Sequence, residues 1–301
     1  MGTLYIIATE EAAGKTAICA GLAINLLNAG KKVGYLKPQA AENDGDISFM
    51  RKIPGLEIIL NASDPLKGRD IVLVEAMPGK KASNAAKGMK AKIIAVEAYT
   101  GQILKNSKVY KEFGESFLGV IINKVPQSQL KRVKEEAAGK YGAGGIKVLG
   151  VIPENRALLA MTVGELAECI QGKILNNADK SGELVENYML GAMVVDSGLD
   201  YFGRKKNKAA VIRQDRLDMQ LAALETPTSC LVLSGSNKSP FYNVLNKAES
   251  RGIPIITTET NVNDIVTSIE KALVKPSLDQ EKKLIKLAEI VKQNLDIKAF
   301  A

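Results

Sequence analysis

The residues with the clearest chemical meaning lie at positions 8–18, which read ATEEAAGKTAI. Lys15 carries an ammonium group that can reach phosphate oxygens, and Thr16 offers a hydroxyl that can bind a magnesium ion. The segment joins an apolar run typical of a buried strand to a run typical of a helix. Backbone N–H groups in such a turn, together with the positive end of the helix, attract anions. The spacing therefore predicts a phosphate-binding turn.

This turn departs from the usual pattern at one position. The pattern has a glycine five residues before Gly14, and Thr9 stands there instead. The alternative interpretation is a plain strand-to-helix turn that happens to carry a lysine. We expect phosphate binding because the strand, turn and helix follow in the required order. The predicted nucleotide-binding residues of the turn are Ala13, Gly14, Lys15, Thr16 and Ala17.

Charged side chains follow two other apolar runs, at what should be the same edge of a sheet. Glu75 ends one run, and a carboxylate there can hold magnesium directly or through water. Asp70 begins the same run, so we expect it at the opposite edge in a structural role. Lys37 follows the second run and can contact a phosphate or an anionic substrate; the alternative is a surface lysine at a turn. Asp44 and Asp46 lie in the loop beyond, and either can complete a metal site.

Apolar runs alternate with helix-like stretches through the first half of the chain, at a spacing typical of parallel βαβ units. Runs such as IVLVE and LGVIIN are almost continuously aliphatic, as expected for strands covered by helices on both faces. The predicted strands are 3–8, 32–36, 70–75, 92–96, 117–123 and 147–152, and the predicted helices are 15–29, 129–140 and 163–170, the last capped by Thr162. We therefore predict an α/β fold with a doubly wound parallel sheet.

A second, smaller α/β series follows a polar stretch after Gly172. Its predicted strands are 185–193, 209–212, 229–233 and 253–258. The loops that follow its later strands, SGSNKSP and TETN, lie where small ligands commonly bind to parallel sheets. We predict a nucleotide-binding domain at 1–175, a second α/β domain at 176–275 and a C-terminal amphipathic helix at 276–301.

The predicted C-terminal helix has an apolar stripe with lysines on its other side. The stripe consists of Leu284, Leu287, Ala288, Val291 and Leu295. We expect this helix to pack on its own domain or on a second subunit, and membrane attachment is the alternative.

The composition limits the chemistry that the chain can perform. Its 301 residues include no histidine, which removes His-based acid–base catalysis and most zinc sites. The three cysteines lie far apart in apolar stretches and are expected to be buried hydrophobes. The net charge is +8, but the lysines are scattered and aromatic residues make up only 5%, so we expect no nucleic-acid partner. Without a basic leader or a membrane-spanning run, we expect a cytoplasmic protein.

Six motifs occur in order in the first half: IIATEEAAGKTAI, YLKP, DGDISFM, DIVLVEAMPG, GVIINKVP and VLGVIPENRALLAMTVGELAE. With them this half resembles the dethiobiotin synthetase-like N-terminal domain of long phosphotransacetylases, which implies a P-loop NTPase-type fold with ATP and Mg²⁺ as cofactors. The resemblance implies Lys15 and Thr16 on phosphate and magnesium, Lys37 near the transferred group, Asp46 and Glu75 at the metal, and Asn123 near the nucleotide base. Lys15 and Lys37 are the implied catalytic residues.

The region from LGAMVVDSG to CLVLSG resembles the DRTGG domain and is similar in fold class to the N-terminal domain of HPr kinase. Asp215 and Arg216 match the first two letters of the family's motif, and Leu217 stands where threonine is usual. Of the glycines that the motif contains, only Gly235 has a counterpart in this sequence. The alternative is that Asp215 and Arg216 only form the first turn of a helix. The resemblance implies a site for ligand sensing or for dimerisation.

Three functions are consistent with these features. The first is a regulatory protein that binds Mg-ATP, with a small-molecule ligand at the DRTGG-like domain. The second is an ATP-dependent enzyme, either a slow ATPase or a dethiobiotin synthetase-like ligase. The third is a non-catalytic interaction subunit. We expect this chain to lack the acetyl-transfer domain of phosphotransacetylases, and so not to make acetyl phosphate by itself. The expected partners are a nucleotide, that small-molecule ligand and a second copy of the chain.

Overall fold

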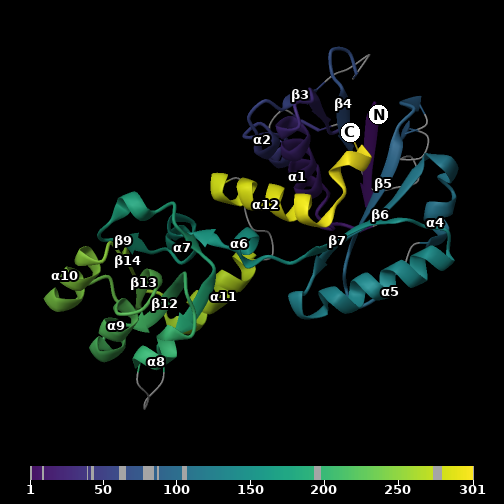
Figure 1. The fold of residues 1–301 in the computed structure, drawn as a ribbon. Helices are drawn as coiled ribbons and strands as arrows, with labels where there is room; N and C mark the ends of the chain where they lie inside the picture. The colour runs from purple at the N-terminus through teal and green to yellow at the C-terminus, as the bar shows by residue number, and fades with distance from the viewer. Residues whose placement is uncertain are drawn as a thin grey trace. The chain divides into compact units, whose positions relative to one another are not determined.

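The computed structural model describes residues 2–8, 10–38, 40–41, 44–60, 66–76, 85–86, 88–103, 107–192, 198–273 and 280–300. The chain divides into two compact units, Met1–Glu154 with Leu278–Ala301, and Asn155–Ser277. Figure 1 shows a sheet with helices in each of them. Thr9, the departure from the phosphate-binding pattern, lies outside the described residues.

A seven-stranded sheet forms the centre of the first unit. Its strand order is β3-β2-β4-β1-β5-β6-β7, and all neighbours pair in parallel. The strands are β1 (Thr3–Ala8), β2 (Val33–Leu36), β3 (Glu57–Ile59), β4 (Ile71–Glu75), β5 (Lys92–Ala98), β6 (Phe117–Val125) and β7 (Val148–Pro153). This confirms the predicted doubly wound parallel sheet. The order of the strands places β4 beside β1, as the predicted metal site requires.

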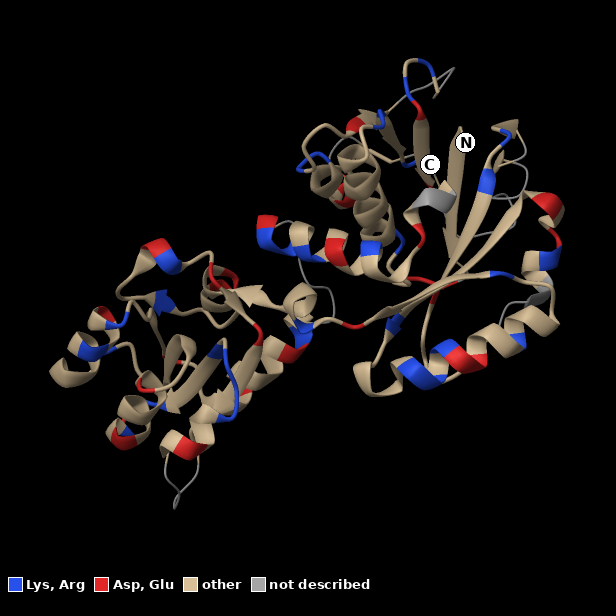
Figure 2. Cartoon of the chain, viewed as in Figure 1, with Lys and Arg blue, Asp and Glu red and all other residues tan. Residues whose placement is uncertain are grey.

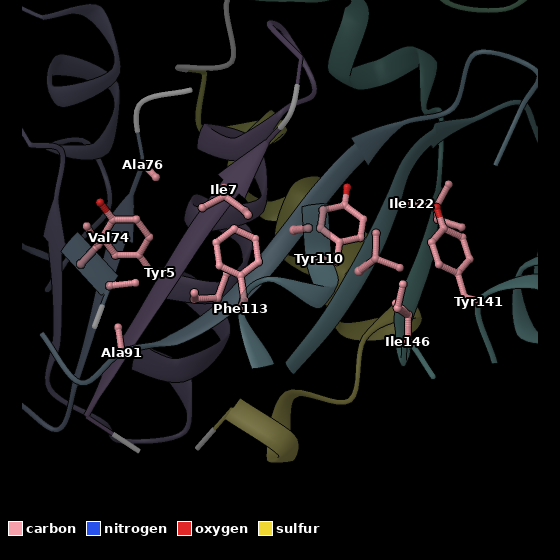
Figure 3. Close-up of a cluster of buried hydrophobic side chains, with 14 of the residues drawn as sticks. Tyr5, Ile7, Val74, Ala76, Ala91, Tyr110, Phe113, Ile122, Tyr141 and Ile146 are labelled. Carbon is pink, nitrogen blue, oxygen red and sulfur yellow. The ribbon is translucent and has the colours of Figure 1, made fainter. Parts of the chain in front are cut away.

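Helices cover both faces of this sheet (Figure 1). They are α1 (Lys15–Asn28), α2 (Gly45–Met50), α4 (Ser107–Lys111), α5 (Leu130–Ala143) and α12 (Glu281–Asn294). Figure 3 shows the core under α4 and α5, where Tyr110, Phe113 and Tyr141 pack with strand residues such as Ile7 and Ile122. A buried carboxylate lies in this core, because Glu97 accepts hydrogen bonds from the hydroxyls of Tyr110 and Tyr141. The burial of both faces explains why these strands are almost purely aliphatic.

The C-terminal helix α12 packs against α1, within the first unit. Asn25 on α1 donates from Nδ2 to the backbone oxygen of Ala288, at 2.9 Å. Gly21 allows this approach, since a Cβ there would lie 2.4 Å from Cγ2 of Val291. The predicted apolar stripe is buried, including Leu287 at 3% exposure. The stripe therefore belongs to the core of the unit that contains β1. Separately, no helix among the described residues is long and apolar enough to cross a membrane.

A five-stranded sheet forms the centre of the second unit. Strands β11 (Asn187–Leu190), β12 (Lys208–Arg213), β13 (Thr228–Ser234) and β14 (Ile255–Thr258) pair in parallel, and β9 (Lys173–Ile174) pairs antiparallel to β14. A separate antiparallel pair joins β8 (Met161–Thr162) to β10 (Leu184–Val185). The helices are α6 (Arg156–Leu159), α7 (Val163–Cys169), α8 (Gly198–Gly203), α9 (Leu217–Leu224), α10 (Tyr242–Ser250) and α11 (Val262–Leu273).

The second unit begins about twenty residues earlier than the boundary predicted at residue 175. Val163 and Leu166 of α7 are buried in one cluster with Val232 of β13, so α7 belongs to the core of the second unit. The helix itself agrees with its sequence, because Thr162 and Glu165 form a capping box. Periodicity located this helix but carried no information about the sheet on which it packs.

The predicted strand 185–193 is broken in the structure. β10 ends at Val185 and pairs with β8, whereas β11 begins at Asn187 and pairs with β12. Met193 lies outside the described residues, as do residues 274–279, where the boundary at 275 was predicted. Cys19 and Cys230 are buried and Cys169 is partly buried, all as free thiols, as expected from their apolar surroundings.

Candidate functional site

The turn before α1 leads into a helix N-terminus that no side chain caps. Gly14 is the N-cap of α1 with φ of 91°, in the left-handed region. The first-turn N–H groups of a helix have no partner within the helix itself. The N-terminus of this 14-residue helix thus presents N–H groups, the positive end of the helix dipole and the Lys15 side chain together. Ala17 lies in the same first turn and is partly exposed.

Asn123 at the carboxyl end of β6 braces this turn. Its Nδ2 donates to the backbone oxygen of Ala13 at 2.9 Å, and its side chain is buried. A Cβ at Gly14 would lie 2.4 Å from the same Nδ2. Glycine is therefore needed at residue 14 for its positive φ and for this close contact. The expected role of Asn123 near a nucleotide base stays a prediction, and its contact with the turn is a feature that sequence reasoning missed.

A second hydrogen bond, made by a residue of the turn itself, connects the turn to the sheet. Glu10 accepts a hydrogen bond at Oε1 from the backbone N–H of Ala98, at 3.2 Å. Ala98 ends β5, the strand beside β1. The turn is thereby attached to the strands on one side of β1, through Glu10 to β5 and through Ala13 to β6. No spacing rule in the sequence pointed to Glu10.

Glu75 lies directly beside the start of α1. Its Oε1 accepts a hydrogen bond from the hydroxyl of Thr16 at 2.9 Å, and its Oε2 accepts one from the hydroxyl of Tyr35 at 2.7 Å. The carboxyl is 4% exposed, and burial raises its pKa, while the hydrogen bonds and the charge of Lys15 act in the opposite direction. The sequence predicted that Glu75 and Thr16 would meet. The contact of Tyr35 with Glu75 was not predicted. The position of Tyr35 two residues before Lys37, near the end of β2, could have indicated that it lies close to the site.

Lys37 lies between two carboxylates that come from the start of α2. Its Nζ is 2.9 Å from both oxygens of Asp44 and 2.5 Å from Oδ2 of Asp46. Burial alone would lower the pKa of Lys37, but the hydrogen bonds to Asp46 and Asp44 outweigh it, and the pKa lies above its ordinary value. Burial alone would likewise raise the pKa of Asp44, but the hydrogen bonds from Lys37 and the α2 backbone lower it. The charge of Asp46 reaches Glu75 and raises its pKa.

The structure therefore brings Thr16 and Glu75 into contact and places Lys15 and Asp46 within electrostatic range of Glu75. Asp70 lies at the opposite edge of the sheet, where its Oδ2 accepts from the backbone N–H of Lys32 at 2.8 Å. Over the described part of the chain, no three acidic, cysteine or histidine side chains gather to form a metal cage. The Thr16 hydroxyl and the Glu75 carboxylate fit magnesium, which is usually held by one or two carboxylates together with phosphate oxygens.

In the second unit, Asp215 and Arg216 each form a local ion pair. The Arg213 guanidinium is 2.5 Å from Asp215 Oδ2, and the Arg216 guanidinium is 2.8 Å from Asp218 Oδ2. Arg216 is the N-cap of α9. Gly235 has φ of 87° and donates its N–H to the oxygen of Thr260, which links the loops after β13 and β14. The motif residues thus lie at the carboxyl edge of the second sheet.

Residues 4–165 match the family model described as the CobQ/CobB/MinD/ParA nucleotide binding domain. The chain belongs to this family. Residues 165–272 of this CobQ/CobB/MinD/ParA-type chain match the DRTGG domain. Together the two matches confirm the predicted combination of a P-loop NTPase-type domain and a DRTGG domain. Because this family binds nucleotides, the turn before α1, with an uncapped helix N-terminus and a buried acid beside it, is the candidate nucleotide site.

Curated relatives of this CobQ/CobB/MinD/ParA-type chain are named phosphate acetyltransferase. The Pseudomonas putida protein is 25% identical over an alignment that covers 98% of this chain and 51% of the relative. The Haemophilus influenzae protein is 21% identical, with 98% and 52% covered. The chain thus spans about half the length of the curated relatives that it matches.

Two solved structures are similar to parts of the chain. The MinC:MinD cell division complex of Aquifex aeolicus is 18% identical, with a TM-score of 0.39 over 53% of this chain and 84% of that chain. The CBS and DRTGG domains of the regulatory region of Clostridium perfringens pyrophosphatase, complexed with its activator diadenosine tetraphosphate, are 15% identical, with a TM-score of 0.33 over 50% of this chain and 73% of that chain.

Proposed function

We propose that this chain binds Mg-ATP at the turn before α1 and acts as a regulatory protein. The observation that carries the proposal is the contact between Thr16 and the buried Glu75, directly beside an uncapped helix N-terminus that bears Lys15. This combination supplies an anion site and oxygen donors for a hard cation at one point. The family match supports a nucleotide as the anion.

Each residue has a defined task in this proposal. The backbone N–H groups after Gly14 and the ammonium of Lys15 bind the phosphates. Thr16, Glu75 and Asp46 would hold Mg²⁺, which supplies positive charge against the phosphate oxygens. Tyr35 orients Glu75 through its hydrogen bond, and because burial raises the pKa of Tyr35, the hydroxyl remains protonated and keeps donating. Asn123 and Glu10 hold the turn in the shape that receives the nucleotide.

The regulatory part of the proposal rests on the second unit. Its sheet edge carries the DRTGG-type residues, and we assign a small-molecule ligand to that edge. A regulatory protein of this kind requires that each ligand changes the affinity for the other by the same factor. Native mass spectrometry of the purified chain, with and without Mg-ATP, would detect a copurified ligand and any change in subunit number.

An ATP-dependent enzyme is the second candidate, and the position of Lys37 favours it. This lysine lies after β2 beside Asp46, where it can neutralise charge on a transferred phosphoryl group. Phosphate release that is steady and lost in Lys37→Met would favour the enzyme. Binding without turnover would favour the regulatory protein.

Isothermal titration calorimetry tests Mg-ATP binding, the step that both candidate functions require. We expect saturable binding by the wild-type chain, and Lys15→Ala should weaken it by about 2 kcal/mol or more, because a hydrogen bond to a charged group is lost. Lys140→Ala on α5 is the control and should bind as the wild type does, since this lysine is 57% exposed. A folded wild-type chain that binds no nucleotide would refute the proposal.

A further inference from the structure

Lys37 is an unusual lysine because carboxylates surround its ammonium group while its side chain is only 15% exposed. Both oxygens of Asp44 and one oxygen of Asp46 lie within hydrogen-bonding distance of Nζ. An ammonium has three protons, so these contacts occupy its donors. In this state Lys37 cannot bind a phosphate without giving up at least one carboxylate.

The two carboxylates differ in how firmly they are held. Asp44 caps α2, because its Oδ1 accepts from the backbone N–H groups of Asp46 at 2.9 Å and Ile47 at 3.3 Å. The Asp46 side chain is 40% exposed, and within the described ranges Lys37 is the one partner of its carboxylate. Asp44 is therefore a fixed partner of Lys37, whereas Asp46 is free to exchange.

The exchangeable partner also lies within electrostatic range of Glu75, the acid at the candidate metal position. The charge of Asp46 reaches both Glu75 and the buried side chain of Cys19 on α1. The Asp46 side of the ion pair with Lys37 is exposed enough for solvent to screen it, so replacing the ammonium on Asp46 by a divalent ion costs less than it would at a buried pair. The ammonium and the ion compete for the same oxygen.

From this geometry we propose that Lys37 occupies the Asp46 carboxylate until a divalent ion replaces it there, and that Asp44 keeps Lys37 beside the site during the exchange. Asp44 is a positioning residue in this scheme. The inference rests on the proposed nucleotide function, but its first step concerns the metal alone. No bond is made or broken; one ion pair is exchanged for another.

Mn²⁺ binding without nucleotide, followed by electron paramagnetic resonance, tests the competition directly. We expect Lys37→Met to bind Mn²⁺ about two- to fivefold more tightly than the wild type, the range that follows from removing one partly exposed ion pair. Asp46→Asn should bind it more weakly. Lys140→Met should match the wild type. Unchanged or weaker binding by Lys37→Met overturns the proposal, and so does the absence of Mn²⁺ binding in every variant.

The role of Asp44 needs a variant that keeps the helix cap. Serine is a favoured N-cap, so Asp44→Ser retains the cap of α2 but removes the fixed carboxylate. We expect Asp44→Ser to bind Mn²⁺ more weakly than the wild type, because Lys37 then rests on Asp46 alone. In a Lys37→Met background the same change should have no effect. An equal effect in both backgrounds would show a purely structural role and overturn the assignment.

The outcomes separate this inference from the proposed function. Tighter Mn²⁺ binding by Lys37→Met, in a chain that fails to bind Mg-ATP, would support the competition at Asp46 and overturn the nucleotide site. Mg-ATP binding with no effect of Lys37→Met on Mn²⁺ would support the nucleotide site and overturn the exchange. Circular dichroism of each variant confirms that the chains compared are folded.

Discussion

Single residues at the turn before α1 are fixed by contacts that come from several strands. Thr16 meets Glu75 of β4, Ala13 meets Asn123 of β6, and Glu10 reaches the end of β5. The sequence predicted Thr16 from the spacing of the turn and Glu75 from its place at the end of an aliphatic run. It could not predict the Ala13–Asn123 contact or the place of Glu10, because these depend on how strands far apart in the chain lie beside one another.

Gly14→Ala tests whether the turn tolerates any side chain. The new Cβ would be strained at φ of 91° and would clash with Asn123 Nδ2. We expect the free energy of unfolding to fall by about 1–3 kcal/mol and Mg-ATP binding to be lost. Gly30→Ala is the matched control, because its φ is also positive, at 78°, but nothing lies within 4 Å of the added Cβ. It should cost about 1 kcal/mol in urea unfolding; equal costs for both variants would argue against the clash.

Lys208 in the second unit makes stability depend on pH. Its side chain is fully buried and its Nζ donates to Thr226 Oγ1 and to the backbone oxygen of Pro227, both at 2.9 Å. Burial lowers the pKa of Lys208 to about 8, from 10.5. The folded state therefore disfavours the proton that the unfolded chain still holds between these pH values. The free energy of unfolding should rise with pH across this window, by up to about 3 kcal/mol.

Urea unfolding of the wild type and of Lys208→Met at several pH values between 7 and 10.5 checks this. Other groups titrate in the same range, so the difference between the two proteins is the quantity to follow. We expect the wild type to gain stability relative to Lys208→Met as the pH rises. Parallel pH profiles would show that Lys208 stays charged throughout.

Among the secondary-structure elements, the long aliphatic strands of the first sheet were easy to predict, and the partners of each element were the hardest to predict. β1 and β4 were located to within a residue because their aliphatic runs are continuous, whereas β3 has three residues and was missed. The helix α12 was recognised by its stripe, but the stripe did not reveal α1 as its partner.

On α5, ion pairs from Glu136 to Arg132 and Lys140 face solvent, and Figure 2 shows basic and acidic positions interspersed along this helix.

Leu287→Ala tests the packing of α12 on the first unit. Leu287 is 3% exposed, so its loss leaves a cavity, and we expect the free energy of unfolding to fall by about 2–5 kcal/mol. Ile285→Ala on the same helix is the control, because Ile285 is 57% exposed and should change stability by less than about 0.5 kcal/mol. Similar small effects for both variants would mean that α12 is not part of this core.

For the molecule as a whole, the sequence predicted two α/β parts in the right order but not where the second begins. The chain returns to its first unit after completing its second, through α12. A prediction from sequence alone treats this C-terminal helix as a separate segment. Local periodicity carries no information about contacts between residues as far apart in sequence as Asn25 and Ala288. The family match at 4–165 covers the first unit apart from its C-terminal segment and extends into the second, and the DRTGG match at 165–272 covers most of the second.

The central claim is that the turn before α1 receives Mg-ATP. The most direct measurement is a crystal structure of the chain grown with Mg²⁺ and a non-hydrolysable ATP analogue. We predict triphosphate density against the N–H groups after Gly14, with Lys15 on the phosphates and an ion beside Thr16 and Glu75. An analogue bound elsewhere on the chain, with this turn empty, would contradict the account.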